Sequence, residues 1–242
     1  MRIYGTHAVL AYLKHKPHLV RTCFIAENLN PASKNQVLHL AQAHQIACET
    51  VSSKTLDKWF PTEPHQGLAL AIPDQAEYSE FDLPEIAAVS KNSLFLILDG
   101  IQDPHNLGAC IRTAEAAGVQ ALIIPKDKAV QITPTVRKIA CGAAEILPTV
   151  SVTNLARALI WLKEQGVWLI GTDMNTPQSL YQVDLTGPIG IVMGAEGTGL
   201  RALTKKHCDI LAHIPMFGST ESLNVSVSTG ICLYEAIRQR SL

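Results

Sequence analysis

LFLILDGIQDPHNLGACIRTAEAAGVQALIIP, residues 94–125, contains two short apolar runs on either side of a segment with helical spacing. The runs LFLIL (94–98) and ALIIP (121–125) are typical of strands that are buried on both faces of a sheet. The segment between them, LGACIRTAEAAGV (107–119), predicts a helix that covers the sheet. Because parallel strands need a crossover connection of this kind, the stretch predicts one unit of an α/β fold with a parallel sheet.

The same alternation of strands and helices continues to the end of the chain. Further strands are predicted at 149–152, 167–172, 189–194 and 210–215, and helices at 134–147, 154–165, 200–208 and in the last residues. In open parallel sheets, ligands bind beyond the carboxyl ends of the strands. We therefore expect the chemistry of this protein in the loops that follow its strands.

The preceding residues predict a smaller α/β module at 1–73. Helices are predicted at 6–15 and 33–44, and strands at 19–26, 46–51 and 67–72. Residues 73–92 carry two prolines and an acidic bias without a long apolar period, which is typical of an interdomain linker. The predicted domains are therefore 1–73 and 93–242, joined by a linker at 74–92.

The composition limits the classes of function. With 242 residues, 47% of them hydrophobic and 17% charged, the chain can bury a substantial core. A formal net charge of -1 gives no overall attraction to nucleic acid or to an anionic membrane, so any RNA site must be a local patch. No apolar run is long enough to span a membrane and the first residues lack a leader cleavage site, so we expect a soluble cytoplasmic protein. The six cysteines and nine histidines lack metal-ligand spacing, and we expect no metal and no disulfide framework.

Two of the loops after strands carry polar residues that a turn alone does not need. In the first loop, Asn106 precedes the predicted helix and could simply cap it, and Arg112 within that helix could be an ordinary surface charge. The second loop, IVMGAEGTGL (191–200), has three glycines that let a ligand approach the backbone. Its single charge, Glu196, is not required by a tight turn and is therefore a candidate functional residue.

The third loop contains GSTESLNVSVSTG (218–230), whose secondary structure the sequence leaves open. Spacing by two fits a half-buried strand, and spacing by 3.6 residues gives a helical stripe of Leu223, Val227, Ile231 and Tyr234. Ser222 and Asn224 precede the last predicted helix, where one of them could act as its cap. Capping needs only one such residue, so the cluster of polar groups indicates a further role.

Together the three loops resemble the signature motifs of the SpoU (TrmH) class of SPOUT RNA methyltransferases. The matching segments are DPHNLGACIRTAEAAG (103–118), VMGAEGTGL (192–200) and IPMFGSTESLNVSVSTGICLYEAIRQR (214–240), in the order and at a spacing similar to those of the family. The resemblance implies S-adenosylmethionine (AdoMet) as methyl donor, a C-terminal trefoil knot and a homodimer to which the last helix contributes. The N-terminal module is similar to the L30e-like RNA-binding domain of members that methylate a guanosine of 23S rRNA, so the implied partner is large-subunit rRNA.

The resemblance also assigns roles to individual residues. The catalytic positions of the family correspond to Asn106, Arg112, Glu196, Ser222 and Asn224. The cofactor-binding positions correspond to Thr172, Gly194, Gly197, Ile214, Met216 and Leu223. Because a guanidinium stays protonated, we expect Arg112 to anchor the phosphate beside the target ribose rather than to accept its proton.

Local basic patches are the candidate RNA contacts, although each could equally be a solvated face. They are Lys126 and Lys128, Arg137 and Lys138, and the N-terminal set Lys14, Lys16 and Arg21. Three alternatives stay open: a methyltransferase for tRNA or another rRNA position, an inactive RNA-binding or ribosome-assembly protein, and a nicotinamide-dependent oxidoreductase. The last is disfavoured because no glycine-rich turn follows the first strand.

Overall fold

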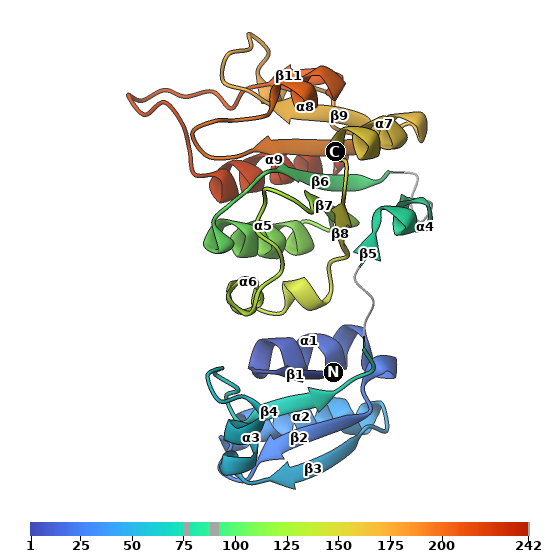
Figure 1. Ribbon diagram of the computed structural model, residues 1–242, viewed down its shortest axis with the longest axis vertical. Helices are drawn as coiled ribbons and strands as arrows, with labels where there is room; N and C mark the ends of the chain where they lie inside the picture. Colours follow the sequence, from blue (N-terminus) through green and yellow to red (C-terminus); the bar gives the residue numbers. More distant parts are fainter. Residues whose placement is uncertain (75–77, 88–91, 242) are drawn as a thin grey trace. The chain divides into compact units, whose positions relative to one another are not determined.

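The computed structural model describes residues 1–74, 78–87 and 92–241 (Figure 1). The chain divides into two compact units, residues 1–76 together with 141–146, and residues 77–140 together with 147–242. Each unit has its own sheet: a four-stranded one in the first unit and a seven-stranded one in the second. The elements of each unit follow from the local sequence, and each unit is described by itself.

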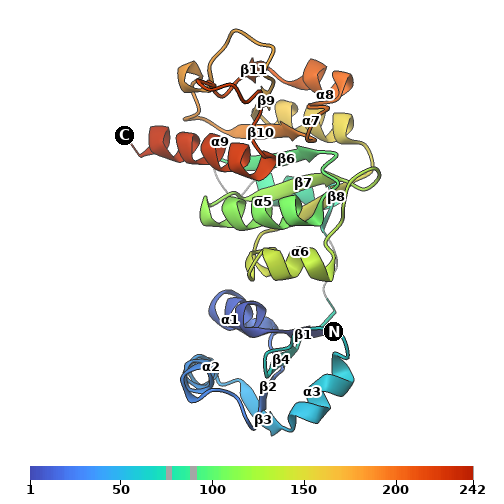
Figure 2. The same cartoon turned by 90° about the vertical axis from the view of Figure 1, so that its left-hand side faces the viewer.

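The first unit is a mixed sheet with strand order β1-β4-β2-β3. Its strands are β1 (Arg2–Tyr4), β2 (Thr22–Ala26), β3 (Ala47–Val51) and β4 (Leu68–Ala71), and its helices are α1 (Thr6–His15), α2 (Pro31–Ala43), α3 (Ser53–Trp59) and the 3-10 turn η1 (Pro17–Leu19). Helices α1 and α2 cover one face and α3 the other (Figure 2). The α/β character predicted for this module is confirmed, and β1 was not predicted because three residues are too few to show a period.

The helix predicted at 134–147 is wrong in its second half. Helix α6 (Pro134–Ile139) ends early, because Cys141 and Gly142 adopt positive φ angles of 51° and 90°. A Cβ atom on Gly142 would lie 2.8 Å from the carbonyl oxygen of His7, so only glycine permits this close approach. Residues 141–146, with the 3-10 turn η3 (Ala143–Glu145), consequently pack within the first unit. Apolar periodicity cannot reveal a chain reversal that depends on a contact with distant backbone.

The second unit is an all-parallel sheet, as the buried apolar runs predicted. Its strand order is β11-β9-β10-β6-β7-β8-β5, and every pair is parallel. The strands are β5 (Tyr78–Ser79), β6 (Leu94–Asp99), β7 (Ala121–Pro125), β8 (Thr149–Val152), β9 (Trp168–Thr172), β10 (Ile189–Gly194) and β11 (Ile210–Ala212). The helices are α4 (Leu83–Ala87), α5 (Pro104–Ala116), α6, α7 (Leu155–Glu164), α8 (Ala202–His207) and α9 (Val225–Arg240), with 3-10 turns η2 (Glu80–Asp82) and η4 (Leu180–Gln182).

Helices α5 and α9 lie on one face of this sheet, and α7 and α8 lie on the other (Figure 2). Strand β6 is buried at all six positions because helices cover both of its sides. Part of the predicted linker belongs to this unit, since β5 pairs with β8 at the sheet edge. Residues 75–77 and 88–91 of the predicted linker lie outside the described residues.

The connection between β9 and β10 runs across the rest of the domain. Its middle lies beside the end of β11, where His213 donates to the Gln178 carbonyl oxygen at 2.9 Å. It then reaches the last turn of α9, where the Gln239 side chain donates to the Val183 carbonyl oxygen at 3.1 Å and accepts from the Leu185 N–H at 2.8 Å. The C-terminal trefoil knot implied by the resemblance stays a prediction.

Candidate active site

The three loops singled out in the sequence all leave the same edge of the second sheet. In the parallel register Asp99, the last residue of β6, is paired with Gly194, the last residue of β10. Thr172 at the end of β9 is likewise paired with Ala212 at the end of β11. The loops that follow these strands therefore start side by side, as the carboxyl ends of neighbouring parallel strands must.

Asn106 lies inside helix α5, so the reading of this residue as the helix cap is wrong. The cap is Asp103, whose carboxylate accepts from the His105 N–H at 3.0 Å. Pro104 then occupies the first helical position, where its missing N–H costs nothing. Asn106 is 8% exposed, and a buried amide needs hydrogen-bond partners. One of these partners is Asn224, more than a hundred residues later in the chain.

The Glu196 loop folds back on itself at the end of β10. Ala195 and Gly199 exchange backbone hydrogen bonds of 3.2 and 2.9 Å, which closes a tight turn around Glu196. A Cβ atom on Gly194 would lie 2.1 Å from the Gly199 carbonyl carbon, so this turn requires glycine there. Gly197 has a φ of 76°, and a Cβ atom on it would meet nothing within 4 Å, so the backbone at this point is open to a ligand.

Asn224 is the N-cap of α9, and the strand reading of the stretch 218–230 is therefore wrong. Its side-chain oxygen accepts from the Ser226 N–H at 2.9 Å and from the Ser226 hydroxyl at 2.6 Å. Helical residues begin at Val225, directly after the cap. The expectation that Asn224 caps the last helix is confirmed, whereas Ser222 lies outside the helix and does not cap it.

The amide nitrogen of Asn224 connects the three motifs through hydrogen bonds. Its amide nitrogen donates to Asn106 Oδ1 at 2.9 Å and to Glu196 Oε1 at 2.8 Å. Glu196 Oε1 also accepts from the Val225 N–H at 3.4 Å. Since both ends of the Asn224 amide are used, its orientation is fixed by the network. The carboxylate of Glu196 is thus held at the amino end of α9, where the helix dipole favours negative charge.

Arg112 and Ser222 are not among the residues that Asn224 joins. Arg112 is exposed on α5, and Ser222 is exposed in the loop before α9. In the described part of the chain the Ser222 side chain makes no hydrogen bond to protein. Three of the five predicted catalytic residues are therefore brought together by hydrogen bonds to Asn224, and the other two present their polar groups on the surface.

Cys110 packs inside the domain, between α5 and α9. Its thiol is fully buried and lies 3.5 Å from the Thr229 hydroxyl. Burial raises the pKa of the Cys110 thiol to about 11. A thiol with this pKa is protonated at neutral pH, so it supplies no reactive thiolate.

Five of the six predicted cofactor residues lie at or just after the ends of the adjacent strands β9, β10 and β11, and the sixth, Leu223, lies partly buried in the loop before α9. Thr172 ends β9 and donates to the Val192 carbonyl oxygen at 3.3 Å, while Ile214 and Met216 follow β11. Within the part of the chain that is described, the backbone N–H groups of Ile214 and Met216 donate to no protein acceptor. Partly exposed apolar side chains beside available backbone donors fit a neutral purine base, so this set of residues suits an adenosyl group.

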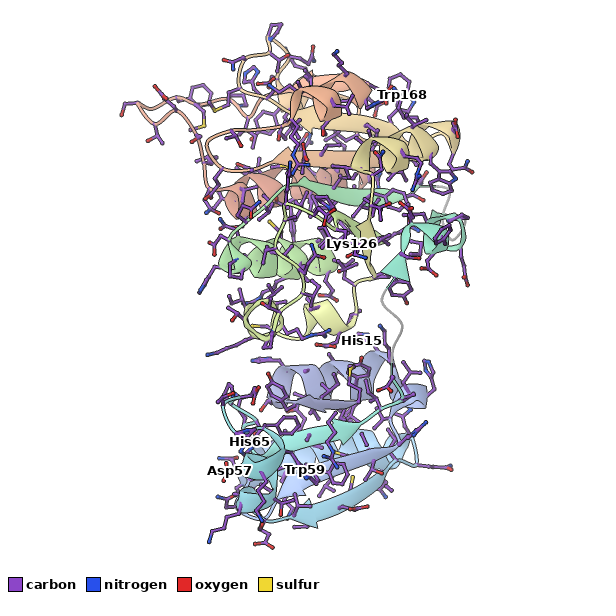
Figure 3. All side chains as sticks on the ribbon, in the orientation of Figure 1. His15, Asp57, Trp59, His65, Lys126 and Trp168 are labelled. Atoms are coloured by element: carbon purple, nitrogen blue, oxygen red, sulfur yellow. The ribbon has the colours of Figure 1, made fainter. Side chains whose placement is uncertain are left out.

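The basic residues predicted as RNA contacts differ in their surroundings. Lys126 and Lys128 are exposed after β7, and Figure 3 labels Lys126. Lys16 is half-buried and its ammonium donates to the Glu145 carbonyl oxygen at 2.6 Å, so it is used within the first unit. Burial lowers the pKa of Lys16 from its ordinary value.

Two further functional candidates were not predicted from the sequence. Asp99, at the end of β6, is 1% exposed. Arg201 follows the Glu196 loop and forms an ion pair with Asp99. The signal available in the sequence was a carboxylate ending an otherwise apolar strand. Among the described residues, no helix has the length and apolarity needed to cross a membrane, and no group of three or more potential ligands is placed to hold a metal ion.

Comparison with known families gives two matches. Residues 93–234 match the SpoU rRNA Methylase family, and residues 2–78 match the family described as RNA 2'-O ribose methyltransferase substrate binding. The two matched segments together cover nearly all of the chain.

Individual relatives extend the same similarity over the full length. The 23S rRNA (guanosine-2'-O-)-methyltransferase RlmB of Pseudomonas putida is 47% identical over 242 residues, covering 100% of this chain and 97% of the relative. The protein of the same name from Escherichia coli K12 is 46% identical over 239 residues, covering 99% and 98% of the two chains. The SpoU methyltransferase AviRb from Streptomyces viridochromogenes, solved in complex with AdoMet, superposes with a TM-score of 0.79 at 25% identity and covers 100% of this chain and 90% of its own.

Proposed function

The chain belongs to the SpoU rRNA methylase family, and we propose that it transfers a methyl group from AdoMet to the ribose 2'-hydroxyl of a guanosine in 23S rRNA. The observation that carries this proposal is the near-complete match to two relatives named for that reaction, at 46% and 47% identity. The match includes the N-terminal module, which is the part expected to choose the RNA. A tRNA or another rRNA as substrate is the alternative, and it would require this module to have changed its specificity.

Five side chains are the proposed catalytic set. They are Asn106, Arg112, Glu196, Ser222 and Asn224. Three of them form the hydrogen-bonded cluster at the sheet edge, which supports a common role. The intact cluster also argues against an inactive RNA-binding protein, because RNA binding alone does not require the buried Asn106 amide to be paired with Asn224.

The set divides into positioning and substrate-binding roles. AdoMet, when bound, supplies an electrophilic methyl group, and Thr172, Gly194, Gly197, Ile214, Met216 and Leu223 would hold it. Asn224 positions the Glu196 carboxylate through its amide and the start of α9 through its oxygen. Arg112, exposed and permanently charged, anchors the phosphate next to the target ribose and stabilises the oxygen as it loses its proton. Ser222 supplies an exposed hydroxyl, suited to bond the substrate or the cofactor.

The Glu196 carboxylate is the group in the cluster that can receive the proton of the 2'-hydroxyl. One of its oxygens accepts from Asn224 and Val225, and the other has no hydrogen bond among the described residues. A carboxylate at the amino end of α9 is held ready for this exchange but is a weak base, so water is the competing acceptor. The pH dependence of the methylation rate in the Glu196→Gln variant distinguishes Glu196 from water as the proton acceptor. A pH–rate profile that matches the wild-type profile assigns the proton to water.

The exposed stripe of α9 is the proposed homodimer contact. Val227 and Tyr234 are each 51% exposed, although they belong to the apolar stripe predicted from the sequence. The buried face of α9 is instead formed by Val225, Cys232, Leu233 and Ala236. An exposed apolar stripe beside the active site is typical of a subunit interface. Light scattering after size exclusion tests this: a monomer would remove the dimer from the proposal.

Analysis of ribosomal RNA tests the reaction itself. Mass spectrometry of 23S rRNA from cells that lack this protein should show the loss of one 2'-O-methylguanosine, restored by the intact gene. Unchanged 23S rRNA together with a methyl group lost from tRNA would support the alternative substrate. Failure to bind AdoMet in calorimetry would instead support an inactive RNA-binding protein. Because 23S rRNA is the proposed substrate, the proposed location is the cytoplasm.

A further inference from the structure

A pocket separate from the Glu196 cluster lies at the carboxyl edge of the large sheet, on the side of α7 and α8. Its volume is about 230 Å³, and the ends of β7 and β8 and the starts of α7 and α8 line it. None of the residues assigned to catalysis or to AdoMet is among those lining it. The pocket shares only the loop 195–201 with the cluster around Glu196, because this loop ends at Arg201 in the pocket wall.

Arg201 is held in this wall by a buried carboxylate. The backbone N–H of Arg201 donates to Asp99 Oδ2 at 3.0 Å, and the side-chain Nε of Arg201 lies 3.4 Å from Asp99 Oδ1. The Asp99 side chain is 0% exposed, whereas that of Arg201 is 45% exposed. The backbone of Arg201 is therefore fixed to the end of β6, its guanidinium forms an ion pair with the same carboxylate, and the side chain stays partly exposed, so its charge is available to an anion in the pocket.

The backbone of Lys128, beside Arg201, is also held by hydrogen bonds. Lys128 adopts a φ of 57°, which is uncommon for a residue with a side chain. Its carbonyl oxygen accepts from Gln102 Nε2 at 2.7 Å and from Arg201 Nη2 at 3.4 Å. Gly100, with φ of 85°, makes room for this arrangement, because a Cβ atom there would lie 2.7 Å from Arg201 Nη2. The two cationic residues are thus set beside each other by backbone geometry.

The rest of the lining indicates what the pocket accepts. Pro125, Leu155 and Leu203 give it apolar walls, and Leu203 is 58% exposed despite its size. Asp127 and Asn154 add a carboxylate and an amide at the rim. Inorganic phosphate would leave the apolar walls unused and would face the Asp127 carboxylate. A nucleotide uses all of these groups, since its base can lie on apolar side chains and offer amino groups to a carboxylate.

We propose that this pocket holds a nucleotide of the substrate RNA next to the one that is methylated. The base lies between Pro125, Leu155 and Leu203, and its phosphate faces Lys128 and Arg201. The shared loop then couples this nucleotide to the Glu196 cluster, so that filling the pocket sets the register of the RNA. The inference rests on the proposed function, because it takes RNA as the substrate.

Two variants and two matched controls test the pocket. Lys128→Gln removes a charge and Leu203→Ser removes an apolar wall, while Lys206→Gln and Ile160→Ser make the same changes at exposed positions outside the pocket. The readouts are the KM for transcribed 23S rRNA, filter binding of the same transcript and calorimetric AdoMet affinity. Each pocket variant should raise the KM and the RNA Kd about tenfold, with AdoMet affinity unchanged, and each control should leave all three unchanged. Lys128→Gln should also lower the slope of log Kd against log salt by about one.

The outcomes separate this inference from the proposed function. If the wild-type protein is active and both pocket variants have its KM and its RNA affinity, the nucleotide pocket is refuted and the proposed function stands. A wild-type protein that binds AdoMet but methylates no 23S rRNA overturns the proposed function, and filter binding then decides the pocket. Loss of AdoMet affinity in either variant would show a disturbed fold around the Glu196 loop and would also count against a separate nucleotide pocket.

Discussion

Replacement of Asn224 by aspartate is the sharpest test of the central network. The change Asn224→Asp keeps the oxygen that caps α9, because aspartate is as good an N-cap as asparagine. It replaces the amide donor by a second carboxylate oxygen, which then faces Glu196 Oε1 at the present distance of 2.8 Å and Asn106 Oδ1 at 2.9 Å. A favourable pair of hydrogen bonds thereby becomes two repulsive contacts at unchanged shape.

The cost follows from the charges and their exposure. Two unit charges 4 Å apart interact with about 1 kcal/mol in water and about 4 kcal/mol at the effective dielectric of a protein surface. Asn224 and Glu196 are both exposed, so we take the lower part of this range, about 1 to 2 kcal/mol. Loss of the two hydrogen bonds adds about 1 kcal/mol. The expected decrease in the free energy of unfolding is therefore about 2 to 3 kcal/mol at neutral pH.

The sign of the pH dependence is fixed by the same repulsion. Glu196 raises the pKa of the introduced carboxyl in the folded state above its unfolded value of about 3.9. The penalty is therefore complete above the folded pKa and is relieved as the pH falls through it. A repulsion of about 1 to 2 kcal/mol raises that pKa by about one unit, so urea unfolding of the variant and of the wild-type protein, compared at about pH 8 and about pH 4, should show a difference that shrinks at the lower pH.

Asn224→Ser is the matched control for this test. Serine keeps the cap and removes the amide donor without adding a charge, so its loss of stability should be about 1 kcal/mol and nearly independent of pH. AdoMet affinity should fall more in Asn224→Asp than in the control, because only the former displaces Glu196. An aspartate variant as stable as the wild-type protein at pH 8, or one whose deficit is the same at both pH values, would refute the network as described.

Three further changes test other parts of the structure. Arg112→Lys keeps the charge but loses the planar fork, so methylation should continue at about a hundredth of the normal kcat/KM; full activity would show that only charge matters. Gly194→Ala should abolish AdoMet binding, since its Cβ would lie 2.1 Å from the Gly199 carbonyl carbon, whereas Gly187→Ala meets nothing within 4 Å and should bind normally; equal affinities would contradict this. Arg240 donates to four backbone carbonyls at 92–93 and 185–187, at 2.6 to 3.4 Å, so Arg240→Ala should cost about 3 kcal/mol in urea unfolding; a loss below about 1 kcal/mol would show that these bonds are replaced by water.

The sequence by itself determined the class of the fold and the places where its chemistry lies. Continuous apolar runs such as 94–98 specify strands buried on both faces, and these must form a covered parallel sheet. The same rule put the ligand site in the loops after the strands, and the polar motifs in three of them could be compared with a known family. Helix α1 was predicted with its correct bounds because its apolar stripe is local.

Tertiary structure alone decided what depends on contacts between distant residues. Asn106 and Asn224 are far apart in sequence, and only the fold shows that Asn106 partners Asn224 instead of capping α5. The end of α6 depends on the close approach of Gly142 to His7, and the spacing of apolar residues gives no sign of this contact. Spacing in the 218–230 stretch fits a strand and a helix equally well, and the family resemblance favours a helix from about residue 224; the structure adds that Asn224 caps this helix at Val225 and also holds Glu196. The spacing of apolar residues indicates whether a segment forms a helix or a strand. Which side chains meet at the sheet edge depends on the register of the strands and on the course of the loops.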